Sequence, residues 1–446
     1  MGRCCFMRVH FIEDKGNIIL YLPDSLKFFK INSTTKSIIK DIVNFNEKTL
    51  IMEKYKINED QYNYIKTFIT KKEIINYEVS KHKECLSKLT LNITNKCNLD
   101  CKYCYANGGI YNSKESQMSE NTLKKTLDVF LDKYKNIQSI QLFGGEPTLN
   151  LAAIEFVGDY FDKKYNIHEI DFKPIISLVT NGTCSSDRFI GIINKYNIQL
   201  TVSIDGPKCI NDKTRLLKNG QGCSDAVISN IFKLKKYTKQ PENAEATFTQ
   251  YHVNSNIEVS DVVEYIKKDL GIQNIHIVPV SCEKTEDFYL KDRSSFVKSI
   301  PEIIENKKKS GYKNNYMIID RIIRNLISKT TSQYICNAGI STFSVSTKGD
   351  IYPCFMLTDI DKYKLGNIRN DDKFSLNISN DKLNLFDNSY KANSLKCKNC
   401  FNNTLCHGCI GINYFNTGNA FKTSEEDCKF MKTLTENIIL SLCKIS

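Results

Sequence analysis

Long hydrophobic runs are missing from this 446-residue chain. No stretch reaches the roughly 20 apolar residues that a membrane-spanning helix needs. Residues 1–13 also lack the apolar core of a secretory signal, so we expect a cytoplasmic protein with no membrane partner. The composition excludes disorder and fibres, because 41% of the residues are hydrophobic and 25% are charged. The length predicts roughly two to four domains.

Acidic residues are outnumbered, with 50 against 62 lysines and arginines, which leaves a net charge of +12. Such an excess is one mark of nucleic-acid binding. The lysines are spread along the whole chain, however, and runs such as 233–239 and 307–309 are typical of solvated helix faces. We therefore do not expect nucleic acid as a partner. Part of the charge is available to offset clustered thiolates or to meet an acidic peptide.

Cysteine is abundant, with 18 residues. Thiols stay reduced in the cytosol, so a disulfide framework is not expected and clustered cysteines there more often bind iron or zinc. Two clusters stand out. Eight further cysteines are scattered, and we interpret them as small buried hydrophobes: Cys4, Cys5, Cys85, Cys184, Cys209, Cys223, Cys282 and Cys443.

Residues 1–80 predict a small α+β module. Three short strands are expected at residues 7–12, 17–22 and 27–31, separated by turn residues. Three helices follow at residues 34–45, 47–54 and 59–69, where apolar residues recur at three- and four-residue spacing. This order suggests a winged-helix-like module.

Residues 86–290 alternate between strands and helices. The six strands are LTLNIT, SIQLFGG, IISLVTNG, QLTVSID, EATFTQY and NIHIVPV, and the helices lie at 119–135, 151–165, 187–196, 225–237 and 257–270. Right-handed βαβ units of this kind predict an α/β fold, an open, partial (β/α)6 barrel of the TIM type. Its chemistry is expected in loops at the carboxyl ends of the strands.

The last third of the chain divides again. Residues 291–335 predict a helical bridge with a break at Pro301. From Cys336 the composition becomes rich in Gly, Asn and Cys, so we expect a separate domain over residues 336–446 that ends in a helix.

The first cysteine cluster follows the first barrel strand. Cys97, Cys101 and Cys104 have CxxxCxxC spacing, which lets one loop wrap three thiolates around a cuboidal cluster and leaves one iron without a protein ligand. Zinc is the alternative, but a structural zinc site needs four ligands, and only His82 and Cys85 stand nearby.

This motif, with an aromatic residue at Tyr103, resembles the signature of the radical S-adenosylmethionine (SAM) superfamily. Gly144-Gly145-Glu146-Pro147, at the end of the second strand, resembles the GGE(P) motif of that family. The resemblance implies that the backbone here and Glu146 receive the amino group of SAM. A glycine pair permits close backbone approach.

The resemblance extends along the barrel. Ser203 and Arg215 lie in a stretch that holds the ribose and carboxylate of SAM in relatives, and a cation suits a carboxylate. Asn181, after the third strand, and Val278, after the sixth, are expected as supporting contacts, the latter for adenine. The implied chemistry is reductive cleavage of SAM to a 5′-deoxyadenosyl radical that abstracts hydrogen. An electron donor such as flavodoxin or ferredoxin is implied as well.

The second cysteine cluster strongly resembles the SPASM domain, which usually holds two auxiliary [4Fe-4S] clusters. The resemblance implies Cys336, Cys354 and Cys409 as ligands of cluster I, and Cys397, Cys400, Cys406 and Cys428 as ligands of cluster II. Cluster I is one ligand short, because residues 337–346 contain no cysteine. Its open iron is suited to a substrate thiolate, although Cys282 or Cys4 are alternatives. Zinc knuckles are the competing interpretation.

The N-terminal module resembles the recognition element of enzymes that modify ribosomally synthesised peptides, which binds a leader as an added edge strand. A generic winged helix is the alternative.

We predict a peptide maturase that forms Cys sulfur-to-carbon thioethers, as in sactipeptides and ranthipeptides. The main rival is an anaerobic sulfatase-maturating enzyme, which makes formylglycine with an aspartate where this chain has Phe355; Asp359 is the nearby substitute. Carbon–carbon cross-linking and epimerisation also remain open. A metal-binding peptide or nucleic-acid module without catalysis would leave Glu146, Ser203 and Arg215 unexplained.

Overall fold

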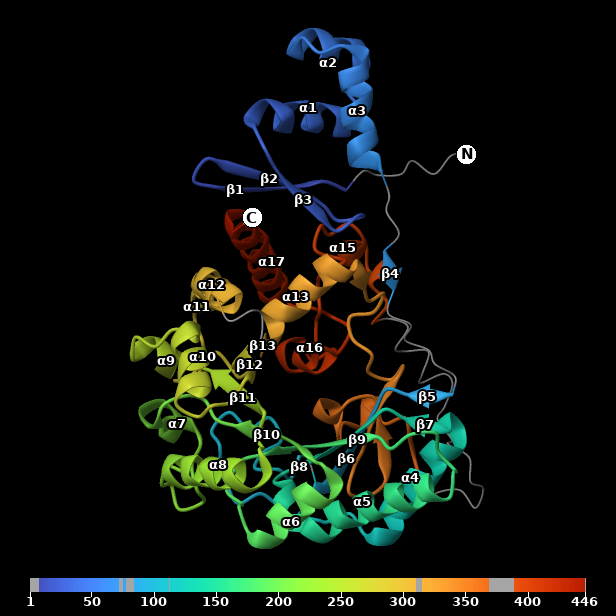
Figure 1. The fold of residues 1–446 in the computed structure, drawn as a ribbon, viewed down its shortest axis with the longest axis vertical. Coiled ribbons are helices and arrows are strands. Elements are labelled where there is room, and N and C mark those ends of the chain that lie inside the picture. The colour runs from blue at the N-terminus through green and yellow to red at the C-terminus, as the bar shows by residue number, and fades with distance from the viewer. Residues whose placement is uncertain are drawn as a thin grey trace.

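The computed structural model describes residues 8–71, 75–77, 84–111, 113–309, 315–368 and 389–445. Figure 1 shows the N-terminal module at one end of the long axis and the barrel at the other, with the C-terminal segments between them. No helix in the described ranges combines the length and apolar character needed to cross a membrane. Cys4, Cys5 and His82 lie outside the described residues.

The N-terminal module contains the predicted three strands and three helices. The strands form an antiparallel sheet in the order β1 (His10–Asp14), β2 (Asn17–Leu22) and β3 (Lys27–Ile31), and the helices are α1 (Ser33–Val43), α2 (Lys48–Tyr55) and α3 (Glu59–Thr70). The sequence predicts the first strand at residues 7–12, whereas β1 begins three residues later, at His10, and ends at Asp14. The register explains the shift, because Lys15 and Gly16 both have positive φ and form the tight turn that pairs Asp14 with Asn17.

Both faces of this sheet are buried, against different partners. Leu20 and Leu22 pack with the helices of the module in a core of its own. Ile12, Ile19 and Tyr21 face the other way and share a core with the C-terminal helix α17 (Glu425–Ile445). His10 stacks on Phe401, with ring centroids 3.5 Å apart, and its Nε2 lies 2.7 Å from Glu436 Oε1. The module is therefore docked on the C-terminal region.

The six predicted barrel strands are present and parallel, in sequence order: β6 (Lys88–Thr94), β8 (Ser139–Gly144), β9 (Ile175–Thr180), β10 (Gln199–Ser203), β11 (Asn243–Phe248) and β12 (Asn274–Pro279). The helices between them are α4 (Glu120–Tyr134), α5 (Leu151–Asn166), α6 (Asp187–Tyr196), α8 (Ser224–Thr238) and α10 (Val259–Lys268), with two short additions, α7 (Lys208–Thr214) and α9 (Gln250–Asn254). These helices lie along the outer side of the strands in Figure 1.

The sheet does not stop at the barrel. Its order is β13-β12-β11-β10-β9-β8-β6-β15-β16-β17, so β13 (Asn315–Tyr316) joins one end and three C-terminal strands join the other. These are β15 (Thr342–Val345), β16 (Asp350–Tyr352) and β17 (Gly366–Asn367). β15 runs parallel to β6, pairing Ser344 with Thr90. The barrel and the C-terminal region therefore share one sheet.

The remaining segments connect these parts. The bridge contains α11 (Ser294–Lys298), α12 (Ile300–Lys309) and α13 (Met317–Ser328), and the predicted break falls at the start of α12, beside Pro301. Two short parallel pairs, β4 (Asn76–Tyr77) with β14 (Thr330–Thr331) and β5 (Cys85–Leu86) with β7 (Asn136–Ile137), lie at the periphery. The C-terminal region adds α15 (Leu395–Lys398) and α16 (Ile410–Thr417).

Candidate functional site

Cys97, Cys101 and Cys104 lie together in the loop that leaves β6. Burial raises the pKa of Cys101 to about 12, although Arg215 opposes the shift. Burial also raises the pKa of Cys97, and both thiols feel the negative potential of Cys104. All the cysteines in the described ranges are free thiols. The loop thus gathers three partly buried thiols that gain from binding a cationic metal centre when they ionise.

The two glycines of the GGEP segment hold this loop in place. Gly145 N donates to Thr94 O at 2.9 Å, and Glu146 N donates to Lys96 O at 2.7 Å. A Cβ at Gly144 would lie 2.0 Å from Thr94 O, and one at Gly145 would lie 2.2 Å from Lys96 O. Gly144 also has a φ of +141°. The close backbone approach predicted for this pair is an approach to the cysteine loop.

Glu146 is completely buried, and both of its carboxylate oxygens already accept hydrogen bonds. Oε1 accepts from Thr148 N (3.0 Å), Thr148 Oγ1 (2.7 Å) and Thr180 Oγ1 (2.8 Å), and Oε2 accepts from Asn181 N (2.6 Å). Burial raises the pKa of Glu146, while these donors favour the anion. The carboxylate therefore ties the end of β8 to the end of β9, a role that the sequence did not indicate.

Asn181 connects β9 with the cysteine loop. Its Nδ2 donates to Asn98 Oδ1 at 2.8 Å and lies 3.9 Å from Cys97 Sγ. Its Oδ1 accepts from Thr183 N and Thr183 Oγ1. Of the two supporting residues predicted, Asn181 is the one that contacts the cysteine loop.

Tyr103 and Arg215 meet at a buried carboxylate that sequence reasoning missed. Tyr103 Oη donates to Asp205 Oδ2 at 2.8 Å and accepts from Arg215 Nη1 at 3.1 Å. Asp205 also accepts from Thr214 Oγ1 and from Thr247 N. Its position, directly after the fourth barrel strand in SIDG, was the available signal.

Arg215 is suited to hold an anion beside the cysteine loop. The residue is only 5% exposed, and its Nε is a buried donor without an acceptor among the described residues. Burial disfavours its charge, but Tyr103, Cys101 and Asp205 outweigh burial and raise its pKa well above the ordinary range. An orphaned guanidinium donor fits the carboxylate of SAM, as the resemblance implies.

Ser203 and Val278 stand at the carboxyl ends of β10 and β12. Ser203 is level with Glu245 in β11, and Val278 is level with Thr247. Among the described residues, neither side chain is hydrogen-bonded to the cysteine loop, so the predicted contacts of Ser203 and Val278 with SAM stay predictions.

Three more thiols meet where β15 and β16 join the barrel. Cys336 precedes β15, Cys354 follows β16, and Cys409 caps the start of α16. Burial raises the pKa of Cys336 to about 11 and raises that of Cys354 further, and both thiols feel Cys409.

A thioether that the sequence reasoning overlooked lies in the same place. The thiol of Cys409 approaches Met356 Sδ at 3.7 Å. Gly411 makes room for this side chain, since a Cβ there would lie 2.6 Å from Met356 Cβ. Met356 is two residues after Cys354, so the signal was its place in the CFM sequence.

The remaining four predicted ligands form a separate group. Burial raises the pKa of Cys406 to about 11; Lys391 opposes the shift, and Cys400, Cys397 and Cys428 add to it. The described residues include no group of three or more His, Cys, Asp or Glu side chains arranged to hold a single metal ion.

Among the scattered cysteines, the prediction of burial is right for Cys223 and wrong for Cys209. Cys209 is exposed because it lies on the outer side of the short helix α7, while Ile210 and Asn211 face inward.

Aromatic side chains fill the space between the first cysteine loop and the C-terminal thiols. The Tyr105 ring lies 6.4 Å from Phe355 and 5.7 Å from Phe415, and Phe355 lies 4.6 Å from Phe143 of β8. Desolvation of its hydroxyl raises the pKa of Tyr105, and Tyr111, Cys104 and Cys354 raise it further. Tyr105 is therefore within electrostatic reach of a thiol from each site.

Family models match two parts of the chain. Residues 91–268 match the radical SAM superfamily, and residues 336–401 match the SPASM iron-sulfur cluster-binding domain. An uncharacterized protein of Methanocaldococcus jannaschii is 31% identical over 65% of this chain and 92% of its own length. The chain belongs to the radical SAM superfamily and carries a SPASM domain. It is an enzyme whose cofactors are SAM with its [4Fe-4S] cluster and auxiliary iron-sulfur clusters.

Two relatives whose names state an activity also match most of this chain. The cysteine-type anaerobic sulfatase-maturating enzyme of Clostridium novyi is 26% identical over 73% of this chain and 87% of its own length. The radical SAM cyclopropyl synthase TigE of Paramaledivibacter caminithermalis is 26% identical over 80% of this chain and 74% of its own.

Solved structures show the same fold. The enzyme anSMEcpe with bound AdoMet has a TM-score of 0.66 at 24% identity, covering 81% of this chain and 99% of its own. SuiB of Streptococcus suis, bound to S-adenosylmethionine, has a TM-score of 0.55 at 14% identity and covers 94% of this chain and 98% of its own.

Proposed function

We propose that this enzyme matures a ribosomally synthesised, Cys-rich precursor peptide by joining cysteine sulfur to a carbon atom of another residue. The observation that carries the proposal is the group formed by Cys336, Cys354 and Cys409, whose partly buried thiols act on one another electrostatically. Residues 337–346 supply no further cysteine. A cluster with three protein ligands keeps one iron for another donor, and the thiolate of a substrate cysteine suits it.

The chain supplies two separate roles in this proposal. When bound, the cofactors of the barrel supply a 5′-deoxyadenosyl radical that removes a hydrogen atom from the substrate. Arg215 and the strand ends around Asn181 hold SAM beside Cys97, Cys101 and Cys104, while Glu146 and Asp205 fix the loops that carry these groups. An electron donor such as flavodoxin or ferredoxin provides the reducing equivalents.

The N-terminal module is proposed to bind the leader of the peptide. In the three-stranded sheet β1-β2-β3, β1 and β3 are the outer strands, and an extended peptide gains main-chain hydrogen bonds by pairing with such an edge. SuiB has been solved bound to its precursor peptide SuiA, and its likeness covers 94% of this chain.

Formylglycine formation is the second candidate, because several relatives are anaerobic sulfatase-maturating enzymes. Phe355 counts against it. The residue after Cys354 carries no proton acceptor, and its ring packs against Phe143 at 4.6 Å. Asp359, four residues on, has a φ of +58° and acts electrostatically on Tyr111 and Tyr352.

The test is anaerobic reconstitution followed by co-expression with short Cys-rich open reading frames beside the coding gene. We expect about twelve irons per chain, conversion of SAM into 5′-deoxyadenosine, and a peptide that loses two hydrogens per thioether. Zinc content or the absence of SAM cleavage would contradict the proposal. A formylglycine product, an epimerised peptide of unchanged mass, or a carbon–carbon cross-link located by fragmentation would replace it.

A further inference from the structure

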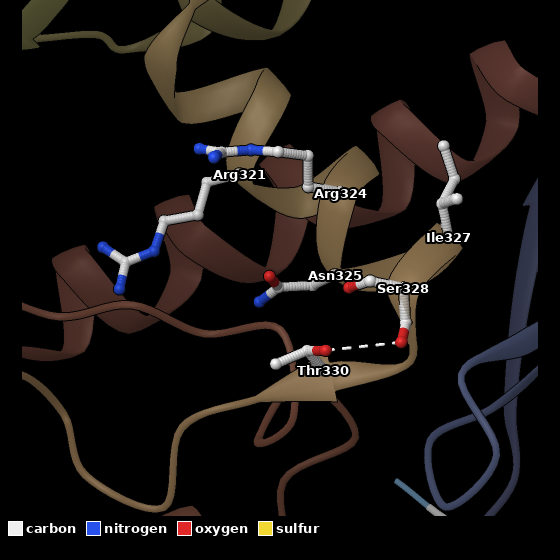
Figure 2. Close-up of a pocket in the computed structure, with 6 residues that line it drawn as sticks. All are labelled: Arg321, Arg324, Asn325, Ile327, Ser328 and Thr330. Atoms are coloured by element: carbon white, nitrogen blue, oxygen red, sulfur yellow. Dashed lines mark hydrogen bonds between the residues drawn. The ribbon is translucent and has the colours of Figure 1, made fainter. Parts of the chain in front are cut away.

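A cavity of about 320 Å³ lies beside α13 and β14, outside the barrel (Figure 2). Its lining consists of Arg321, Arg324, Asn325, Ile327, Ser328 and Thr330. Figure 2 shows the two arginines and Asn325 on the helix, Ser328 at its end and Thr330 just beyond it. Thr330 Oγ1 donates to Ser328 O at 3.3 Å, which closes this turn. No acidic side chain belongs to the lining.

The sequence of α13 places two cations on one face. Ile319, Ile322 and Leu326 are buried on the opposite face, so Arg321 and Arg324, three residues apart, project from the exposed face as neighbours. Asp320, the acidic residue of this helix, is buried, with its Oδ1 2.6 Å from Lys307 Nζ, and Arg324 also acts on it electrostatically.

The cavity lies between the N-terminal module and the group formed by Cys336, Cys354 and Cys409. On one side, Lys329 Nζ donates to Leu26 O of the module at 2.5 Å. On the other side, the positive potential of Arg321 reaches Cys336, and Asn325 Nδ2 lies 2.9 Å from Nε2 of His407, which stands between Cys406 and Cys409. The cavity therefore adjoins both the module and the segment that carries Cys406 and Cys409.

We propose that the Arg321–Arg324 cavity binds a carboxylate side chain of the precursor peptide, in the segment that joins the leader to the modified core. This inference rests on the proposed function, which supplies the peptide. Two guanidinium groups present forked donors that match carboxylate oxygens, and Asn325, Ser328 and Thr330 add neutral polar groups to the lining. The residue bound here sets the distance from leader to modified residue.

The probe is a fluorescein-labelled peptide, Gly-Glu-Gly-Glu-Gly-Glu-Gly, and its control is the same peptide with Gln in place of Glu. Anisotropy is measured anaerobically with the reconstituted full chain. We expect the wild type to bind the Glu peptide at least about tenfold more tightly than the Gln peptide, with the preference fading at high salt. In the double variant Arg321→Gln, Arg324→Gln, we expect a preference of less than about twofold. The control Lys233→Gln, which removes a cation from α8, should keep the wild-type preference.

Equal affinity of the wild type for both peptides, or an unchanged preference in the double variant, would overturn the inference. So would displacement of the probe by inorganic phosphate at lower concentration than by unlabelled Glu peptide, since the cavity would then be a phosphate site. SAM cleavage and iron content are measured on the same samples. Their loss in the wild type refutes the proposed function, whereas intact cleavage with unchanged peptide preference in the double variant refutes the cavity alone.

Discussion

Cys97, Cys101 and Cys104 lie on one loop, whereas Cys336, Cys354 and Cys409 come from three segments that strand pairing and helix packing bring together. Backbone hydrogen bonds from Gly145 and Glu146 tie the loop to the end of the neighbouring strand β8, so the loop needs little beyond the barrel. The second group depends on β15 pairing with β6 and on α16 docking beside it. The first site is thus formed by one local segment and the second by tertiary contacts. Different substitutions should therefore disrupt the two sites.

The largest effect is expected from Cys101→Ala. Removing one of three ligands on a single loop should lower 5′-deoxyadenosine formation by at least about a thousandfold, because the radical cannot be generated without the cluster. Iron should fall by about four per chain, while the auxiliary signals in the electron paramagnetic resonance spectrum remain. Loss of all iron would mean that the two sites are not assembled independently.

Cys354→Ala should separate radical formation from its use. We expect SAM cleavage without peptide to stay within about threefold of the wild type, and peptide modification to fall by at least about a hundredfold, because the loop of Cys101 does not require Cys354. Liquid chromatography of both products on one sample checks this. If peptide modification is unchanged in Cys354→Ala, Cys354 is not part of the site that acts on the peptide.

Gly145→Ala tests the stapling of the first loop. The new Cβ would lie 2.2 Å from Lys96 O, so the loop must move and SAM should bind at least about tenfold more weakly in equilibrium dialysis. Gly191→Ala is the matched control, since no atom lies within 4 Å of a Cβ there and alanine favours helix α6. If Gly145→Ala and Gly191→Ala bind SAM equally tightly, the close contact between Gly145 and Lys96 does not contribute to SAM binding.

Asp205→Asn should have an intermediate effect. An amide cannot accept all the hydrogen bonds that reach this carboxylate from Tyr103, Thr214 and Thr247, so we expect a loss of about 2–4 kcal/mol in the free energy of unfolding of the holoenzyme. Denaturation in urea gives the stability. Tyr103→Phe, which removes one of the donors, should lower the free energy of unfolding by less than Asp205→Asn, which replaces the shared acceptor.

The smallest effect is on thiol reactivity in the cluster-free chain. Because burial raises the pKa of Cys406 and Cys336 to about 11, the thiolate fraction at pH 8 is small and alkylation by iodoacetamide should be slow. The rate should climb through pH 9 to 11, as each group loses its proton. Peptide mapping by mass spectrometry compares these residues with the exposed Cys209, and equal rates at pH 8 would contradict the burial.

The contrast also explains what the sequence revealed. CxxxCxxC, GGEP and the six strands are local patterns, and the structure reproduces the strands and brings the motif residues Cys97, Glu146, Asn181 and Arg215 together. Asp205 and Met356 were missed because their importance arises from long-range contacts, with Tyr103 and with Cys409. The junction of β15 with β6 was missed for the same reason, since a four-residue strand has too short a pattern to reveal its partner.

The shared sheet affects how the chain melts. Residues 91–268 and 336–401 match two family models, but β15 covers the edge of β6, whose Leu89, Leu91 and Ile93 are fully buried. The two units should therefore unfold in one cooperative transition. A chain truncated before β15 would expose the unpaired backbone edge of β6 and should aggregate. The N-terminal module, whose helices keep a core of their own, is the part able to open first.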